Sequence, residues 1–468
     1  MHHYKMSPRL LAFSVLAAVA SAKQSGGYSL FLSLSITLTM GLDTTLPVSE
    51  VLWFPEAPAE YVGSPSIAAC PIDGSLVASH DNFGRTASFG GAQRSFDGGV
   101  TWTSAPPAAG LPSLYWATLF TRPLDNRTYA FGVTGDNSRG PAQIAIAASS
   151  DCGVSWTAAS SLSSGNVGFS TGPTPVISAG GRLWRAFERN DGPDWPGSYT
   201  SLVMSAAANA SDLLEPSAWT LSGGLPFSSV ASKVPSSWQH PSVSSNFGWL
   251  EGNVVEPPDG SLGVSILLRV NSAPAANKAA LLSLAEPNGV PVFVSWVDFP
   301  GGMSKFTVRR DAASGSYVTL SNYVNDAKGL EALVSLPPTC GPLTNASALG
   351  VSKTLRCCSI SQAEACTPPP AACAWCHANA RNVLVLSESK DLINWRVVGE
   401  PLLSDDTGIP AWSSELFTGF QYVDWLFSGA DILAVIRAGY RGANAYHNSN
   451  RILFSRVKNW ALHGELKR

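Results

Sequence analysis

The sequence predicts an all-β protein folded as a closed β-propeller of six blades, with seven compact blades as the alternative. Three features lead to this prediction. The chain of 468 residues contains 42 glycines and 33 prolines, and long helical periodicities are scarce. Strand-like segments such as "LGVSILLRV" and "RILFSRV" are separated at regular intervals by turn residues. A short motif that combines aspartate, glycine and tryptophan also recurs along the chain.

The N-terminus has the pattern of an export signal. Lys5 and Arg9 precede an apolar run over residues 10–20, and the small residues "ASA" that end at Ala22 offer a cleavage site. We therefore expect a signal peptide over residues 1–22 and a protein that is secreted or located in the secretory pathway.

A second apolar stretch, residues 28–42, alternates with serine and threonine. It is shorter than the roughly 20 apolar residues that a membrane-spanning helix needs. We expect residues 23–50 to form a linker, with an N-terminal membrane anchor as the alternative, and residues 51–468 to form the propeller.

The bulk composition excludes some classes of partner. Charged residues make up 13% of the chain, the formal net charge is −3, and no basic stripe is present, which argues against nucleic acid. The 15 tryptophans favour contacts with sugar rings, although most of them belong in the core. We expect a monomer that binds a glycan or polysaccharide and needs no metal or organic cofactor.

The cysteines also fit an exported protein, because their number, eight, is even. Six of them lie within residues 340–376, and we expect this segment to be an insertion stapled by disulfides, with a zinc site as the alternative. The other two, Cys70 and Cys152, either pair or remain free. Three N-glycosylation acceptors point the same way: Asn126, Asn209 and Asn345.

The recurring motif is clearest in "RSFDGGVTW" (residues 94–102). We expect Asp97 to accept hydrogen bonds from turn amides, an adjacent glycine to supply a positive φ, and Trp102 to cover the hairpin with apolar surface. "SSDCGVSW" (residues 149–156) repeats the pattern, with weaker echoes in "SKDLINW" and "ASDLLEPSAW". A unit of roughly 50–60 residues that holds several short strands is typical of a propeller blade.

A propeller must close on itself, because every open blade would leave unpaired strand edges. We expect the strand "RILFSRV" to join the chain around residues 51–66 and so complete the ring. We also expect the aspartate turns to lie on the outer rim.

These turns resemble the Asp-boxes, or bacterial neuraminidase repeats, of the sialidase superfamily, and the chain from about Tyr61 onward is similar to that superfamily. The resemblance implies a propeller of the sialidase type and an exo-acting, retaining glycosidase for terminal, acidic sugars. Sialidases hold the substrate carboxylate with three arginines, use an aspartate as acid/base, and use a tyrosine nucleophile that a glutamate activates. A neutral phenol attacks a centre beside a carboxylate without charge repulsion.

Three segments match the sialidase pattern in the family order. "LEGNVVEPPDGSL" resembles the segment of the catalytic glutamate, which implies that role for Glu251, and the next strand ends at Arg269, which resembles the second clamp arginine. "ARNVLVLSESKDLINW" is similar to the strand of the third clamp arginine and gives Arg381. "GFQYVDWLFSGADILAVIRAGY" resembles the nucleophile segment and places Tyr422 in that position.

The first landmark departs from the family. Sialidases begin with Tyr-Arg-Ile-Pro, whereas this chain has "YVGSPSI" (residues 61–67), so the first clamp arginine is missing. The segment "VASHDNFGR" then offers Asp81 as the acid/base, with His80 beside it and Arg85 as a candidate substrate-binding residue. Because an arginine–carboxylate pair is a main source of recognition, its loss keeps two alternatives to the hydrolase open. These are a non-catalytic carbohydrate-binding propeller and a polysaccharide lyase on the same fold.

The predicted site residues should converge at the centre of the ring. We expect the Tyr422 hydroxyl to lie about 2.6–3.2 Å from Glu251 and Asp81 to lie on the opposite wall. Glu188 and His240 are further candidates for lining the site. The residues expected to line one cleft from separate blades are Asp81, Glu251, Arg269, Arg381 and Tyr422.

Overall fold

The computed structural model describes the chain in ranges: residues 43–44, 48–53, 60–83, 88–104, 113–135, 141–239, 246–324, 378–399, 401–404, 414–415, 417–440, 443 and 445–464. The expected signal peptide, the apolar stretch 28–42 and the cysteine-rich segment 340–376 lie outside these ranges. Within them, no helix is long and apolar enough to cross a membrane.

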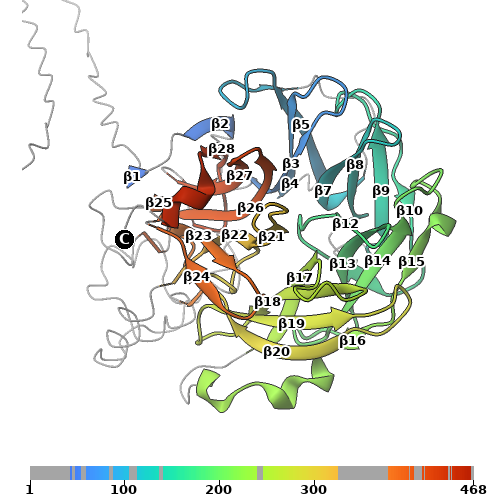
Figure 1. The fold of residues 1–468 in the computed structure, drawn as a ribbon, viewed down its shortest axis with the longest axis vertical. Coiled ribbons are helices and arrows are strands. Elements are labelled where there is room, and N and C mark those ends of the chain that lie inside the picture. The colour runs from blue at the N-terminus through green and yellow to red at the C-terminus, as the bar shows by residue number, and fades with distance from the viewer. Residues whose placement is uncertain are drawn as a thin grey trace, which may run out of the picture. The chain divides into compact units, whose positions relative to one another are not determined.

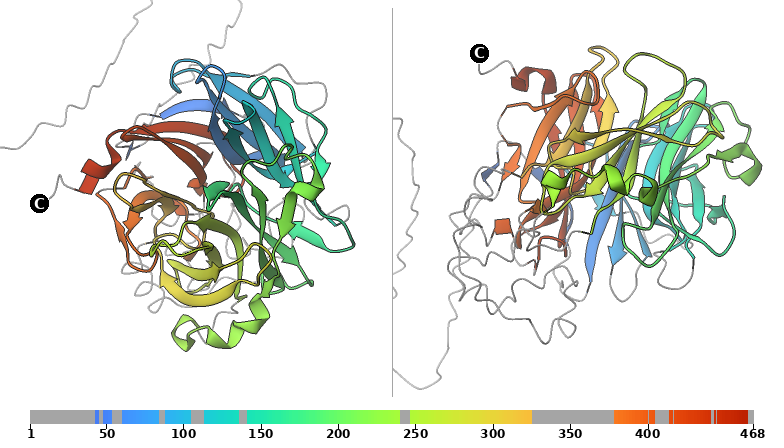
Figure 2. Two further views of the ribbon diagram at one scale, coloured as in Figure 1. Left: turned by 45° about the vertical axis from the view of Figure 1, so that its right-hand side comes forward. Right: turned by 90° about the horizontal axis from the view of Figure 1, so that it is seen from below.

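Six antiparallel sheets form a closed ring, which confirms the predicted six-bladed propeller (Figures 1 and 2). In blades 1, 2 and 4 the first strand along the chain is innermost and the following strands pair outward, whereas in blades 5 and 6 the N-terminal strands β1 (Asp43–Thr44) and β2 (Val48–Trp53) are added at the outer edge. Blade 1 holds β3 (Tyr61–Ala69), β4 (Leu76–Phe83), β5 (Ser88–Ser95) and β6 (Thr103–Ser104); blade 2 holds β7 (Tyr115–Arg122), β8 (Arg127–Val133), β9 (Ile144–Ser149) and β10 (Ser160–Ser161). Blade 3 holds β11 (Gly168–Ser170), β12 (Ile177–Ala179), β13 (Arg182–Asn190), β14 (Tyr199–Ala207), β15 (Trp219–Leu221) and β16 (Leu225–Pro226).

The second half of the ring repeats this layout. Blade 4 holds β17 (Gly248–Val255), β18 (Val264–Asn271), β19 (Lys278–Leu284) and β20 (Val292–Asp298). Blade 5 holds β21 (Thr307–Arg310), β22 (Tyr317–Asn322), β23 (Val383–Ser389), β24 (Trp395–Val397), β25 (Leu403–Ser404) and β1 (Asp43–Thr44); blade 6 holds β26 (Gly419–Ser428), β27 (Asp431–Gly439), β28 (Arg451–Val457) and β2 (Val48–Trp53). Among the described residues, short 3₁₀ helices lie at Pro216–Ala218, Phe227–Ser229, Ala231–Lys233, Ser236–Trp238 and Trp460–Gly464.

The ring closes where the two ends of the propeller meet. The N-terminal strand β2 pairs antiparallel with β28 and becomes the outermost strand of blade 6. In Figure 1 the blue β2 lies beside the red β28. The expected closure by "RILFSRV" is therefore confirmed. It covers the outer edge of β28 with a strand from the other end of the propeller.

The hydrophobic core consists of layers between neighbouring blades. Each of the six large clusters of buried apolar side chains combines residues from two adjacent sheets. The strands are buried on both faces in this way, and they read as apolar runs such as "SILLRV" rather than as strict alternations.

The aspartate turns of blades 1, 2, 3 and 5 connect each of these blades to the one before it. Asp97 accepts hydrogen bonds from the amides of Val100 and Thr101 at 3.0 and 2.9 Å, which fixes the hairpin between the third and fourth strands. The tryptophan that follows each turn packs against an aromatic ring of the preceding blade. The pairs are Trp102 with Phe454, Trp156 with Phe89, Trp219 with Phe131 and Trp395 with Phe299, with ring centroids 5.4, 5.9, 4.8 and 4.9 Å apart.

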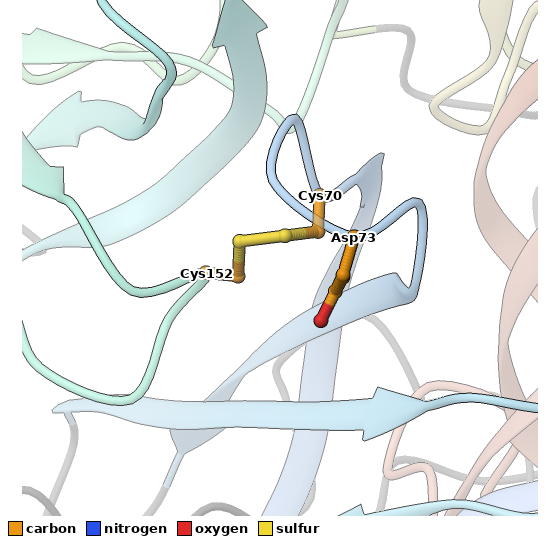
Figure 3. Close-up of side chains that lie close together, drawn as sticks. All are labelled: Cys70, Asp73 and Cys152. Carbon is orange, nitrogen blue, oxygen red and sulfur yellow. A yellow bond between two sulfur atoms is a disulfide. The ribbon is translucent and has the colours of Figure 1, made fainter.

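A disulfide adds a covalent link between blades 1 and 2 (Figure 3). Cys70 and Cys152 are bonded, with their Cα atoms 5.4 Å apart and a sequence separation of 82 residues. Asp73 lies beside the bridge and forms an ion pair of 2.7 Å with Arg94. Because the two sulfurs are bonded to each other, this group offers no thiolate to a metal ion.

Candidate active site

Four innermost strands present a strained residue to the centre of the ring. Strands β3, β7, β17 and β26 each contain a register shift, typical of a β-bulge. At each shift a residue other than glycine adopts a left-handed conformation, which costs roughly 1–3 kcal/mol and persists only where the surroundings impose it. These residues are Ser64, Trp116, Glu251 and Tyr422, with φ of 48°, 49°, 55° and 54°.

Buried polar contacts between innermost strands hold these bulges in place. The Asp424 carboxylate of β26 accepts hydrogen bonds from the Ser66 hydroxyl at 2.6 Å and the Ile67 amide at 3.1 Å, both in β3. The Val423 carbonyl, beside the strained Tyr422, accepts a hydrogen bond of 2.8 Å from the buried Lys305 ammonium. Burial lowers the pKa of Lys305 to about 7. The backbone that aims Tyr422 is thus fixed from both neighbouring blades.

Two of the strained residues contact each other across the ring. The Tyr422 hydroxyl donates a hydrogen bond of 2.6 Å to Glu251 Oε1. Arg269 Nη1 lies 2.8 Å from Glu251 Oε2 and 3.0 Å from the Tyr422 hydroxyl. Glu251 and Arg269 are buried, whereas Tyr422 is half-buried. The structure therefore brings these three predicted residues together, with the phenol as the accessible member.

The electrostatics of this group keep the phenol protonated. Burial and the Glu251 carboxylate raise the pKa of Tyr422 above its usual 10.0, although the nearby guanidinium groups oppose the shift. Burial alone lowers the pKa of Arg269, but the Glu251 carboxylate and the Tyr422 phenol together outweigh it and raise that pKa. At neutral pH Tyr422 is a neutral hydroxyl aimed at a carboxylate, so it can lose its proton as it attacks.

Arg381 joins the group from blade 5. Its guanidinium lies 5.7 Å from the centre of the Tyr422 ring and donates hydrogen bonds to the Gln421 and Asn379 side chains. Burial lowers its pKa to about 10, so it remains charged at neutral pH.

A further guanidinium, which the motifs do not indicate, completes the group. Arg437 of β27 is buried and lies 5.0 Å from the centre of the Tyr422 ring. It pairs with Gln421, the residue before Tyr422, just as Arg269 pairs with Leu250, the residue before Glu251. Aligning the hairpins "GVSILLR" and "DILAVIR" on this register identifies Arg437 from sequence.

Asp81 occupies the same register position in blade 1. It pairs with Gly63, the residue before the left-handed Ser64. Its Oδ2 accepts a hydrogen bond of 2.8 Å from the Trp116 amide. Burial raises the pKa of Asp81 to about 8, against the opposing effects of that amide and the Arg437 guanidinium. Asp81 is thus a protonated carboxylic acid at neutral pH, and the Arg437 guanidinium acts electrostatically on both Asp81 and Tyr422.

The other sequence candidates have different positions. His80 points away from Asp81 into the sheet, where its ring lies 3.2 Å from Gln93, and burial lowers its pKa to about 4. Glu188 is buried and accepts a hydrogen bond of 2.9 Å from the Gly252 amide, so it supports the backbone next to Glu251. Arg85 and His240 lie outside the described residues.

The central cluster, defined as Asp81, Glu251, Arg269, Arg381, Tyr422 and Arg437, is strongly cationic. Burial and repulsion from the three guanidinium groups lower the pKa of His447 well below its usual value. Such a field repels metal ions and attracts anions.

The fold and the cluster define a six-bladed propeller with a tyrosine–glutamate pair, a protonated aspartate and three guanidinium groups at its centre. No protein-family model and no curated protein matches the chain.

Several solved structures are similar in fold. The α-L-arabinanase of Penicillium chrysogenum, complexed with arabinobiose, is 13% identical over 88% of this chain and 98% of its own, with a TM-score of 0.49. The Hadza microbial sialidase Hz136 is 13% identical over 86% of this chain and 66% of its own, with a TM-score of 0.48. Trypanosoma rangeli sialidase in complex with sialic acid is 13% identical over 89% of this chain and 59% of its own, with a TM-score of 0.47. At such identities the likeness concerns the fold alone.

Proposed function

We propose that the protein is a retaining exo-glycosidase that removes a terminal, acidic sugar from a glycan, by an exo-α-sialidase-like mechanism. The observation that carries the proposal is the 2.6 Å hydrogen bond from the Tyr422 hydroxyl to Glu251. A strained, half-buried tyrosine aimed at a buried carboxylate is the arrangement that an activated phenol nucleophile needs.

The reaction proceeds in two steps. In the first, the Tyr422 oxygen forms a bond to the anomeric carbon and transfers its proton to Glu251, while the bond to the leaving oxygen breaks and Asp81 protonates that oxygen. In the second, Asp81 takes a proton from water, which attacks the same carbon. The glycosyl–tyrosine bond breaks, and Glu251 returns the proton to Tyr422. Two inversions give net retention of the anomeric configuration.

The guanidinium groups serve binding and charge stabilisation. Arg269 contacts both Glu251 and Tyr422, so it holds the pair together and stabilises the phenolate character that develops during attack. Arg381 has no carboxylate partner among the described residues and is available to a carboxylate on the sugar.

The test is the Tyr422→Phe variant, assayed on a panel of glycans with terminal acidic sugars. We expect the loss of turnover to exceed about 10³-fold, as when other hydrolases lose a nucleophile, with binding nearly unchanged. Tyr317→Phe is the matched control, because its hydroxyl donates to the Glu256 carbonyl at 2.6 Å, outside the cluster. Product configuration, followed by proton NMR, should show retention.

Each alternative to the proposal has its own signature in this assay. Binding without turnover by the wild-type protein indicates a carbohydrate-binding propeller. An unsaturated product that absorbs in the ultraviolet indicates a lyase. Either result, or full activity in Tyr422→Phe, rejects the proposed mechanism.

A further inference from the structure

We propose that Arg437 replaces the missing first clamp arginine from a different strand, and that a substrate carboxylate binds between Arg437 and Arg381. This inference deepens the proposed function and rests on it. It makes Arg437 a specificity-determining residue at a position that the sialidase motifs do not mark.

Arg437 occupies the space beside Gly63. Counted back from Pro65, Gly63 stands where the arginine of Tyr-Arg-Ile-Pro stands. A Cβ atom on Gly63 would lie 3.1 Å from Arg437 Nη1 and 3.2 Å from its Cζ. The Arg437 guanidinium therefore fills the space that a side chain at position 63 would enter. The glycine and the relocated arginine depend on each other.

The guanidinium charges of Arg381 and Arg437 have no carboxylate partner among the described residues. Neither Arg381 nor Arg437 forms an ion pair within the described part of the chain, although both are buried. Arg437 donates hydrogen bonds to neutral acceptors, the Ser449 hydroxyl at 2.9 Å and the His447 carbonyl. A buried guanidinium without a counter-ion is costly, so two of them beside one accessible tyrosine favour an anionic ligand.

Arg269 differs from Arg381 and Arg437 because its charge is already paired. That arginine already contacts a carboxylate, Glu251, at 2.8 Å. Arg381 and Arg437 instead lie on the Tyr422 ring, 5.7 and 5.0 Å from its centre. A planar carboxylate matches the fork of donors that a guanidinium presents. The uncompensated pair thus lies beside the nucleophile.

The experiment moves the arginine back to its family position. The variants are Arg437→Ala, the double variant Gly63→Arg/Arg437→Ala, and the control Gly63→Ala/Arg437→Ala, which adds a Cβ without a guanidinium. Gly63 has no positive φ, so it accepts other residues, and the ring edge of Phe83 at 2.9 Å is the contact that must shift. Arg396→Ala, which removes an exposed arginine of blade 5, serves as the surface control.

Binding is measured by calorimetry with N-acetylneuraminic acid and glucuronic acid, each against its methyl ester. We expect at least one acid to bind more tightly than its ester. Arg437→Ala should weaken the acid about 10- to 100-fold and leave the ester unchanged, as expected for loss of a charged hydrogen bond. Gly63→Arg/Arg437→Ala should recover most of that loss, and the alanine control should recover none.

Several outcomes overturn the inference. They are equal losses for acid and ester in Arg437→Ala, no recovery in a folded double variant, a wild-type protein that prefers neither acid, and a preference for a sulfated sugar such as glucose 6-sulfate. If Arg437→Ala does not fold, Arg437→Gln keeps a donor for the His447 carbonyl, and the same comparison applies. Because binding needs no turnover, a protein that binds acids through Arg437 without cleaving them rejects the glycosidase proposal and leaves this inference intact.

Discussion

Replacing Asp81 with asparagine separates acid catalysis from packing, because the two side chains have nearly the same shape. Asp81 is 1% exposed, and burial raises its pKa from 3.8 to about 8. At pH 6, two units below that pKa, about 99% of the side chains carry the proton that the leaving oxygen needs. The wild-type kcat/KM should stay level up to about pH 8 and then fall about tenfold per pH unit.

The variant should lose this behaviour in a way that depends on the leaving group. With a sugar leaving group, kcat/KM of Asp81→Asn should fall about 10²- to 10⁴-fold, and the basic limb near pH 8 should disappear. An activated aryl leaving group departs without protonation, so its loss should be much smaller. Asp259→Asn is the control. This exposed side chain accepts a hydrogen bond of 3.0 Å from the Ser261 amide through its Oδ1 atom, which asparagine keeps.

The same shift affects stability. Between pH 3.8 and about 8 the folded protein retains a proton on Asp81 that the unfolded chain has released, so the free energy of unfolding falls as pH rises through this window. The full shift of about 4 units corresponds to at most about 6 kcal/mol. Asp81→Asn lacks this dependence and should gain stability over the wild type toward pH 9 in urea unfolding.

Two other buried groups near the site have a pKa close to that of Asp81, so either of them could cause the basic limb of the pH profile. Burial raises the pKa of Glu188 to about 8 and lowers that of Lys305 to about 7. A basic limb that stays near pH 8 in Asp81→Asn would assign the limb to one of these groups. Equal losses on sugar and aryl leaving groups would show that Asp81 is not the acid.

The remaining predictions concern the support of the site and the ring. Gly172→Ala should lower kcat about tenfold with monosaccharide binding unchanged, because the added Cβ would lie 3.0 Å from Glu251 Cγ and displace that side chain. Gly289→Ala is the control. An unchanged kcat in Gly172→Ala, or an equal loss in the control, would contradict this prediction. Replacing Cys70 and Cys152 by alanine should lower the free energy of unfolding by about 4.5 kcal/mol, the loop entropy of an 82-residue separation. Urea unfolding measures this loss, and an unaltered midpoint would contradict it.

The fold was predictable because the repeated motif carries a structural role. Asp97 and its equivalents form turns through contacts with their own neighbours in sequence, and each following tryptophan packs on the preceding blade. Such local chemistry leaves a local pattern. The sequence does not show whether Cys70 pairs with Cys152, because these two segments of different blades meet only when the ring has closed.

The site was predictable only where the resemblance supplied a motif. Glu251, Arg269, Arg381 and Tyr422 follow family segments, and the structure places them together. Arg437 has no motif, since its position depends on the register between β26 and β27 and on the empty space at Gly63. Neither property is visible in a linear pattern until the hairpins are aligned on their bulges.

That register suggests how this propeller separates folding from chemistry. In three blades the same two positions contribute to the central cluster or its surroundings. The first is the left-handed residue of the innermost strand. The second lies in the next strand, opposite the residue that comes just before the left-handed one. The pairs are Ser64 with Asp81, Glu251 with Arg269, and Tyr422 with Arg437. The bulge aims both side chains whatever their chemistry, because contacts between innermost strands and the outer turns hold the backbone. The chemistry at these inner positions can therefore differ from blade to blade without altering the ring. This is why the aspartate turns predict the fold, whereas the inner positions bear on the proposed substrate.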